Sequence, residues 1–300
     1  MHATLFSLNG RIVPQSEAVV PVTDRGLLYG DGLFETMHAY GGKIFRLPAH
    51  VQRLRNGMQH LFFEQQPSSK LLVKWLQQAV STVAFPEGNV RLTVTRGSNA
   101  RGPALSPDLK PTVIITVTEH LRDGDPRTKM GVRAVVADFR RQESSVLSGL
   151  KTLNYLEQIL ARREAQLLGA DEALLLNNAG LLCEGSASNI SLVRCNGDSD
   201  DVCLCIPDPK RAGALPGIAQ ITAMDAARNL GIPVCETCLS PWDLTRSQEA
   251  FLSGSMREIS PLIQVGDTPV GDGKPGPVTR RIIAEYRRIV ERECAPFKYA

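Results

Sequence analysis

The chain has 300 residues, of which 43% are hydrophobic, and this length suits two domains of ordinary size better than one core. Its 34 lysines and arginines nearly balance its 31 aspartates and glutamates, for a formal net charge of +3. A general nucleic-acid-binding protein would carry a clustered basic face, so that class is not indicated. We also find no apolar run near the ~18 residues that cross a bilayer and no signal-peptide pattern. We therefore expect a cytoplasmic protein without nucleic-acid or membrane partners.

The seven cysteines are an odd number without a small-domain framework, which also suits a reducing compartment. Cys235 and Cys238 form a Cys-x-x-Cys pair, but no second pair follows at zinc-ribbon spacing. All five histidines lie at or before position 120, so we expect no metal site. Cys203 and Cys205 alternate in an apolar run and are predicted to be core residues.

Residues 1–119 predict a small α/β domain. An Asn-Gly turn inside Leu5–Val13 indicates a hairpin, and Gly41-Gly42 indicates a second one between strands Phe34–Tyr40 and Lys43–Leu47. Further elements are predicted as a helix from near Pro48, a helix capped by Ser68 or Ser69, and strands Val90–Thr95 and Thr112–Thr118. The polar residues 120–131 then predict a linker to a domain over 132–300, which opens with strand Val132–Ala137.

Two features of the first domain have both a functional and a structural interpretation. The glycine-rich run Asp24–Thr36 allows close backbone approach, and its Tyr29 and Phe34 can line a cavity, but it also fits a simple turn before a strand. Arg53 lies next to the apolar stripe of the first helix, where it could bind an anion or lie along the surface.

Lys151 is the most informative residue of the predicted domain over 132–300. It follows Ser-Gly and precedes an apolar run at helical spacing (Leu153, Leu156, Ile159, Leu160, Leu167, Leu168), which predicts a place in the first turn of a helix. The positive end of the helix dipole and an apolar setting would both favour the neutral amine, the form of lysine that attacks a carbonyl. A plain surface lysine remains the alternative.

Glu184 lies in a Gly/Ser turn between the strand-like runs Ala173–Leu176 and Ile190–Val193, where a carboxylate is poorly solvated. A buried carboxylate must be paired or protonated, and pairing with a pyridinium nitrogen is what a pyridoxal-phosphate (PLP) enzyme requires. Lys151 and Glu184 together therefore suggest this cofactor, and a structural turn glutamate is the alternative. Further on, Ala214–Ala219 starts a helix whose free amides can hold a phosphate.

Three segments resemble the class IV aminotransferases, the PLP fold type IV group of branched-chain and D-amino-acid aminotransferases and aminodeoxychorismate lyase. They are Lys-Thr-Leu-Asn-Tyr-Leu-Glu from Lys151, Gly-Ala-Asp-Glu-Ala-Leu-Leu-Leu-Asn from Gly169, and Glu-Gly-Ser-Ala-Ser-Asn-Ile from Glu184. The resemblance extends from about Leu5 to Val290. It implies a two-domain α/β (α+β) fold, with a small N-terminal α/β sandwich and a larger C-terminal β-barrel-like domain with helices.

The resemblance also implies roles for individual residues. Lys151 would hold the cofactor as a Schiff base and act as the catalytic base. The other implied cofactor-binding residues are Arg53, Tyr155, Glu184, Leu215, Gly217, Ile218, Ala219, Gly254 and Ser255, and those implied to face the substrate are Tyr29, Phe34, Thr36, Arg101 and Met256. Ala219 and Gln220 replace the Thr-Arg that the family usually has after Gly-Ile.

The activity implied is transfer of an amino group from an amino acid to a 2-oxo acid, with the lyase as the alternative. Pro103 replaces the histidine of the Arg-x-His pattern of D-amino-acid enzymes, and Thr36 replaces the glycine of the branched-chain Phe-Glu-Gly. Gly30-Asp31-Gly32 and Arg96-Gly97-Ser98 resemble the lyase, but several aminotransferases share them. An inactive relative that binds a partner is a third alternative. Family active sites borrow a loop from a second subunit, so we also expect a homodimer.

Overall fold

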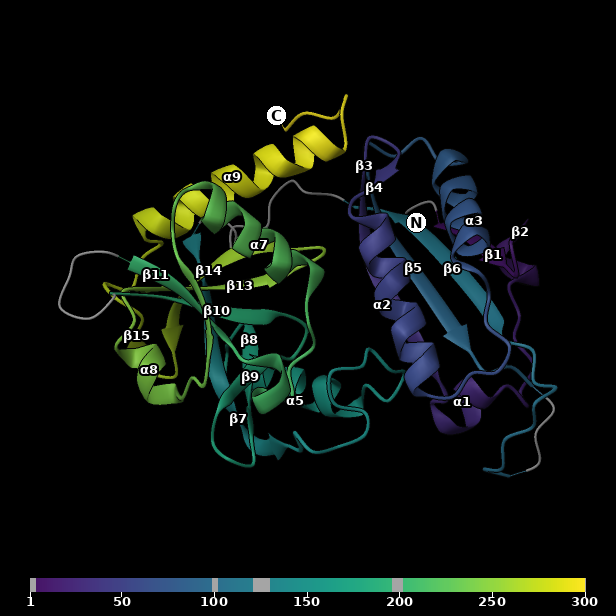
Figure 1. Cartoon of the computed structure of the whole chain (residues 1–300), viewed down its shortest axis with the longest axis horizontal. Helices are drawn as coiled ribbons and strands as arrows, with labels where there is room; N and C mark the ends of the chain where they lie inside the picture. Colours follow the sequence, from purple (N-terminus) through teal and green to yellow (C-terminus); the bar gives the residue numbers. More distant parts are fainter. Residues whose placement is uncertain (1–3, 99–101, 121–129, 196–201, 300) are drawn as a thin grey trace. The chain divides into compact units, whose positions relative to one another are not determined.

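Figure 1 shows the computed structural model of the chain, which describes residues 4–98, 102–120, 130–195 and 202–299. The chain forms two compact units. Unit 1 comprises Met1–Arg122, Leu150–Asn154 and Glu291–Ala300, and unit 2 comprises Asp123–Gly149 and Tyr155–Val290. The short segment that carries Lys151 thus belongs to unit 1, although the chain on both sides of it belongs to unit 2.

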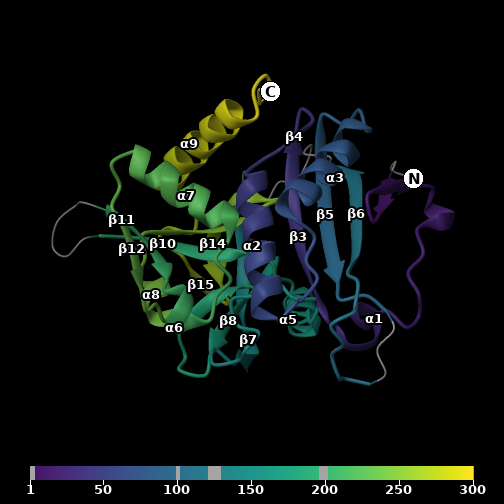
Figure 2. The same cartoon turned by 45° about the vertical axis from the view of Figure 1, so that its right-hand side comes forward.

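Unit 1 is built on an antiparallel sheet with the strand order β2-β1-β6-β5-β3-β4. The strands are β1 (Thr4–Leu8), β2 (Arg11–Val13), β3 (Gly32–Tyr40), β4 (Lys43–Ile44), β5 (Glu87–Thr95) and β6 (Thr112–Glu119). The helical segments are η1 (Gln15–Glu17), α1 (Arg25–Tyr29), α2 (Leu47–His60) and α3 (Ser69–Ser81). Helices α2 and α3 cover one face of the sheet (Figure 2) and share an apolar core with it. The predicted sandwich of helices on a sheet is therefore present.

Side-chain alternation along β3 gives its two faces different chemistry. Leu33, Met37 and Ala39 point into the core that α2 and α3 cover, and Glu35 alternates with them on this side. Phe34, Thr36, His38 and Tyr40 consequently occupy the other face of the strand. The predicted return strand after Gly41-Gly42 is short, because the helix already begins at Leu47 after a left-handed Arg46 (φ 51°).

Unit 2 contains a larger, mixed sheet with the order β12-β11-β10-β13-β14-β7-β8-β9, and β15 pairs with β14. Its strands are β7 (Val132–Arg141), β8 (Glu172–Asn177), β9 (Leu182–Gly185), β10 (Asn189–Cys195), β11 (Val202–Pro207), β12 (Val234–Thr237), β13 (Glu249–Gly254), β14 (Glu258–Val265) and β15 (Thr268–Pro269). Gly185 N donates to Ser188 O at 2.6 Å, so β9 turns tightly into β10 and the sheet curls back on itself. The helices are α5 (Leu156–Leu167), α6 (Pro209–Ala212), α7 (Ile218–Asn229), α8 (Pro241–Thr245) and α9 (Pro277–Glu293).

Two predictions about the Lys151 region are wrong. Helix α5 begins only at Leu156, so Lys151 does not lie in the first turn of a helix. The helix is also buried through the small residues Ala161 and Ala165, whereas Leu156, Ile159, Leu160, Leu167 and Leu168 are each more than half exposed. Only small side chains allow α5 to approach β8 closely, and the larger apolar residues are left on its outer side.

None of the helices in the described ranges combines the length and apolar character needed to cross a membrane.

Candidate active site

Lys151 is held in unit 1 by extended backbone pairing with the start of β3. Phe34 N donates to Lys151 O at 2.9 Å, Leu153 N donates to Gly32 O at 3.0 Å, and Thr152 forms a β-bridge with Leu33. The two backbone bonds flank Thr152, and the first of them fixes the carbonyl of Lys151 itself. Its position is therefore set by a strand edge and not by a helix N-terminus.

The surroundings of Lys151 favour a neutral amine. Its Nζ lies 4.6 Å from the centre of the Phe34 ring, and the residue is half-buried. Burial and the nearby charges of Arg53 and Arg91 lower the pKa of Lys151 to about 8, while Glu35 opposes this shift. The neutral amine that the sequence predicted therefore has a different cause, namely desolvation and two arginines in place of a helix dipole.

Glu35 links β3 to α2 through a buried charged trio. Its Oε2 lies 2.7 Å from His50 Nδ1, and Arg53 donates from Nε to Oε1 at 2.8 Å and from Nη2 to Oε2 at 2.6 Å. Burial alone would raise the pKa of Glu35, but Arg53 and His50 lower it to about 2. Burial also lowers the pKa of His50, against the effect of Glu35. Arg53 is thus oriented by Glu35, which sequence reasoning did not single out.

Of the residues expected to face a substrate, the structure describes four. Phe34 is buried and Thr36 follows it on the same face of β3, and the Arg91 guanidinium lies 3.9 Å from the centre of the Phe34 ring. Tyr29 ends helix α1 and is 44% exposed. Met256 belongs to unit 2, whereas Arg101 lies outside the described residues. Arg91 is a second residue that sequence reasoning missed, because its spacing is that of any strand residue.

The glycine-rich segment before β3 is held by ion pairs. Asp31 accepts from Arg25 Nε at 2.7 Å and from Arg96 Nε at 2.9 Å. Burial raises the pKa of Asp31, but its hydrogen bonds with the two arginines outweigh that effect and lower it. Arg25 also donates to the carbonyls of Gly102, Pro103 and Ala104. The loop after β5 is therefore anchored to the segment that leads into Phe34.

Glu184 is the central residue of unit 2, and it lies in strand β9 and not in the predicted turn. The turn follows it at 186–188, because β9 pairs with β8 through Gly185. Glu184 is 8% exposed, pairs through Oε1 with Arg141 Nη1, and accepts from Leu215 N at Oε2 at 2.9 Å. The carboxylate is thus paired, as its burial requires. Arg141, at the end of β7, is a partner that sequence reasoning did not identify.

Tyr155 and Leu215 lie close to Glu184 within unit 2. The Tyr155 hydroxyl donates to Ser186 O at 3.3 Å, two residues after Glu184. Leu215 is half-buried, and its carbonyl accepts from Asn189 Nδ2 at 2.8 Å. Asn189 therefore fixes the segment that presents both the Leu215 amide and the start of α7.

The N-terminus of α7 has the features of an anion site. Gly217 is its N-cap, and no described side chain caps the helix, so the first amides depend on another acceptor. A Cβ at Gly217 would lie 1.8 Å from Asn189 Oδ1, so only glycine allows this approach. Ile218 and Ala219 follow in the first turn and are buried. Gln220 instead donates to Ile190 O at 2.9 Å and thus secures the helix to β10.

Gly254 ends β13, and Ser255 and Met256 follow it in the turn to β14; all three are half-buried. A Cβ added at Gly254 would lie 3.4 Å from Ala187 O, which places this turn beside the loop that follows Glu184. Both are organised by Glu172, whose side chain is fully buried. It accepts from Ser186 and Ser188 and pairs with Arg257 Nη2 at 3.1 Å. The sequence around Glu172, an Asp-Glu pair at the start of strand β8, did not indicate these contacts.

The two units carry different functional groups. Unit 1 offers an amine with a pKa of about 8 and an oriented guanidinium. Unit 2 offers a buried carboxylate and backbone amides at a helix N-terminus. An amine nucleophile, a carboxylate for a ring nitrogen and donors for a phosphate are the groups that PLP requires of a protein.

Two relatives match nearly the full chain. A putative branched-chain-amino-acid aminotransferase of Methanocaldococcus jannaschii is 32% identical over 284 residues, which cover 94% of this chain and 95% of that protein. A D-alanine aminotransferase of Listeria innocua is 30% identical over 303 residues and covers 98% of both.

Solved structures share the fold at similar identity. The T.th. branched-chain amino acid aminotransferase with pyridoxamine 5'-phosphate has a TM-score of 0.88 at 28% identity, covering 98% of this chain and 97% of that one. The 4-amino-4-deoxychorismate lyase from Pseudomonas aeruginosa has a TM-score of 0.83 at 31% identity, covering 95% and 98%. The predicted fold is therefore confirmed.

The sequence family described as amino-transferase class IV matches residues 32–265, a range that includes Lys151, Glu184 and the start of α7. The chain therefore belongs to the class IV aminotransferase family.

Proposed function

We propose that this protein is a PLP-dependent aminotransferase that moves an amino group from an amino acid to a 2-oxo acid, with substrates like those of the branched-chain enzymes. The observation that carries the proposal is the match to the class IV aminotransferase family over residues 32–265, which contain Lys151 with its pKa lowered to about 8. When bound, PLP supplies the electron sink for the bond changes at the amino acid's Cα.

The residues that would hold the cofactor are those that the resemblance implies. Lys151 would attach it covalently, and the phosphate would be bound by Arg53, by the first turn of α7 at Gly217, Ile218 and Ala219, and by Gly254 and Ser255. Leu215 would pack on the cofactor ring. The Tyr155 hydroxyl would give up its hydrogen bond to Ser186 O and donate to the phenolic oxygen of the ring. Glu184 would face the ring nitrogen with Arg141 as its ion-pair partner, because a carboxylate stabilises a protonated nitrogen.

Lys151 then acts as the general base. Its neutral Nζ would take the proton from the Cα of the substrate and hold it for return. Tyr29, Phe34, Thr36 and Met256 would contact the substrate, and Arg101, which lies outside the described residues, is the candidate partner for its carboxylate. The partners are therefore small amino acids and 2-oxo acids.

The alternative is 4-amino-4-deoxychorismate lyase, in which the same residues lead to loss of pyruvate. The structural likeness to the Pseudomonas enzyme favours it. The M. jannaschii relative, with 32% identity over 94% of the chain, favours the aminotransferase. D-amino-acid activity has support from the Listeria relative, but Pro103 stands where those enzymes usually have a histidine. An inactive partner-binding protein would not need a lysine with a lowered pKa.

We further propose that the enzyme is a cytoplasmic homodimer. The seven cysteines are free, which suits a reducing compartment. Helix α5 exposes Leu156, Ile159 and Leu160 on one face, and contiguous apolar surface of this kind is typical of an interface.

Product analysis tests the activity. The purified enzyme is incubated with aminodeoxychorismate and, separately, with L- and D-amino acids plus 2-oxoglutarate or pyruvate. New amino acid from a branched-chain donor supports the proposal, and pyruvate from aminodeoxychorismate alone supports the lyase. Borohydride should fix a pyridoxyl group on Lys151. A label on another lysine, or full turnover by Lys151→Ala, would overturn the mechanism.

A further inference from the structure

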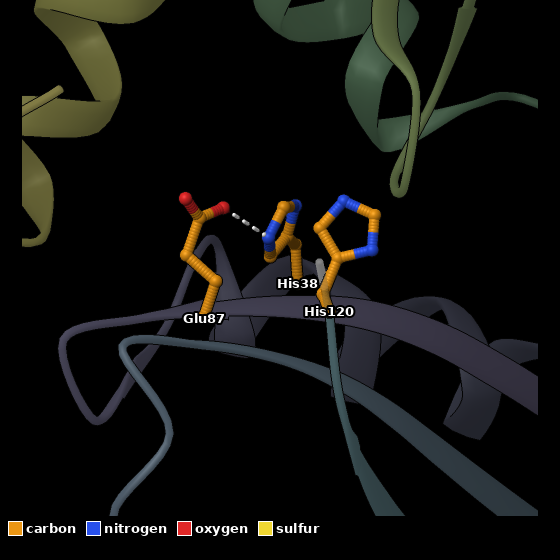
Figure 3. Close-up of side chains that lie close together, drawn as sticks. All are labelled: His38, Glu87 and His120. Carbon is orange, nitrogen blue, oxygen red and sulfur yellow. Dashed lines mark ion pairs between the residues drawn. The ribbon is translucent and has the colours of Figure 1, made fainter. Parts of the chain in front are cut away.

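A cluster of metal-binding side chains lies in unit 1, apart from the residues assigned above. It consists of His38 on β3, Glu87 at the start of β5 and His120 just after β6, and Figure 3 shows the three side chains converging above the sheet. One nitrogen or oxygen from each residue lies within 4.8 Å of the other two.

Strand register brings these distant residues together. Tyr40 pairs with Glu87 across β3 and β5, Gly88 pairs with Glu119 across β5 and β6, and His120 N donates to Glu87 O at 3.0 Å. His38 lies two residues before Tyr40, so its side chain leaves the sheet on the same face. The three side chains therefore meet at one end of three adjacent strands.

His38 is placed as a ligand would be. It is 2% exposed, and its ring is held by stacking on Tyr40, with 3.9 Å between ring centres. Its Nε2 lies 2.8 Å from Glu87 Oε2, yet neither ring nitrogen makes a well-aligned hydrogen bond to any described residue. A buried imidazole in this state needs a partner along its lone pair, and a cation between Nε2 and Oε2 would provide it.

We propose that His38, Glu87 and His120 form a binding site for one divalent transition-metal ion, with Zn²⁺ as its best representative. Two imidazoles and a carboxylate are donors that zinc prefers, whereas Mg²⁺ and Ca²⁺ prefer oxygen ligands alone. Zinc bonds of ~2.0–2.2 Å in a tetrahedron place ligand atoms ~3.3–3.6 Å apart. His38 Nε2 and Glu87 Oε2 lie 2.8 Å apart and would separate by roughly 0.5–0.8 Å to admit the ion.

His120 has to approach the other two ligands. Its ring centre is 4.7 Å from that of His38, the two planes meet at 80°, and the residue is half-buried, so its side chain has room to turn. Three protein ligands leave a fourth position for water. The ion would tie the ends of β3, β5 and β6 together. The sequence predicted no metal site, because positions 38, 87 and 120 share no motif.

The test uses PLP-loaded enzyme without an affinity tag, freed of metal with a chelator and titrated with Zn²⁺ against a zinc-binding dye. One equivalent should bind per chain and raise the thermal midpoint. His38→Gln, Glu87→Gln and His120→Gln should each weaken binding by at least ~10-fold. His120 is half-buried, so its variant should fold even if His38→Gln does not.

X-ray absorption and a second variant separate this site from the cysteine pair on and beside β12. The expected shell has nitrogen and oxygen at ~2.0–2.1 Å, whereas thiolate ligands would appear at ~2.3 Å. Cys235→Ser/Cys238→Ser should bind zinc like the wild type. Absence of binding, binding unchanged in His120→Gln, or sulfur in the shell with loss in the cysteine variant would each overturn the proposal.

Discussion

At the residue scale, the lowered pKa of Lys151 predicts how the capture of PLP depends on pH. Because burial and two arginines lower this pKa to about 8, the fraction of neutral amine should rise about tenfold per pH unit below 8 and level off above it. Capture of PLP by the cofactor-free enzyme should follow that curve. Arg91→Gln removes one of the cations and should move the inflection upward. Arg11→Gln, an exposed arginine of the same unit, should leave the inflection unchanged.

A rate that is flat from about pH 6 to 9, or an inflection that Arg91→Gln moves downward, would contradict this account of the lysine.

Glu184→Gln tests charge at nearly constant shape. The amide can still accept from Leu215 N, but it no longer carries the negative charge assigned to the ring nitrogen. Turnover should fall by ~10²–10⁴ while PLP is retained, because the phosphate contacts are separate. Glu236→Gln, an exposed glutamate on β12, is the matched control and should behave like the wild type. A loss below about threefold would make Glu184 a structural residue only.

Functional residues could be predicted from the sequence where a short motif contains them. The side chains that contact those residues could not. Lys151 and Glu184 stand in local patterns that the family shares. Arg141 and Glu172 act through contacts with residues 43 and 14 positions away, so their roles become visible only when the strands are placed. The pKa of Lys151 likewise depends on Arg53 and Arg91, which no window around the lysine contains.

At the scale of elements, the Glu35 trio should determine how firmly β3 is joined to α2. The pKa of Glu35 is about 2 in the folded chain and ordinarily 4.5. Its stabilising effect is therefore complete above pH 4.5 and is lost as the pH falls from 4.5 toward 2. Glu35→Gln should lower the stability of unit 1 at pH 7 by roughly 3 kcal/mol, because it leaves Arg53 and His50 without their anion.

Urea denaturation at about pH 7 and about pH 3 measures the contribution of the Glu35 trio to stability. The difference in stability between the wild type and Glu35→Gln should shrink at the lower pH. Glu64→Gln, an exposed glutamate in unit 1, should match the wild type at both values. An equal difference at both pH values would mean that the trio contributes through packing alone.

Elements themselves were predicted well where turn chemistry is local. The Asn9-Gly10 hairpin and the Ser68 cap of α3 are present as expected, with Ser68 accepting from Leu71 N at 3.2 Å. The prediction that the large apolar residues of α5 are buried was wrong for a physical reason. Helical spacing identifies an apolar face but does not show what that face contacts. Two alanines bury this helix, and the leucines point elsewhere.

At the scale of the whole molecule, the chain crosses between its units more often than a contiguous division allows. Leu150–Asn154 and Glu291–Ala300 complete unit 1 from the middle and the end of the sequence. At the end, Arg46 Nη2 lies 2.9 Å from Glu293 Oε1, and the rings of Tyr40 and Phe297 lie 5.1 Å apart. Contacts between segments so far apart in the sequence depend on how the strands and helices pair. Composition and the polar linker residues do not predict that pairing.

The homodimer is the prediction that belongs to this scale. Leu156, Ile159 and Leu160 are 66%, 57% and 55% exposed at positions that share one face of α5, and burying them against a second copy would remove apolar surface from water. Ile159→Glu should therefore weaken self-association, because a charge in a buried interface is costly. Trp242→Glu is the control, since Trp242 is a 66% exposed apolar residue on α8. Light scattering at assay concentration should show a dimer for the wild type and Trp242→Glu and a smaller species for Ile159→Glu, with turnover reduced in step. A fully active wild-type monomer would exclude the dimer as the active form, and a stable Ile159→Glu dimer would place the interface away from this face.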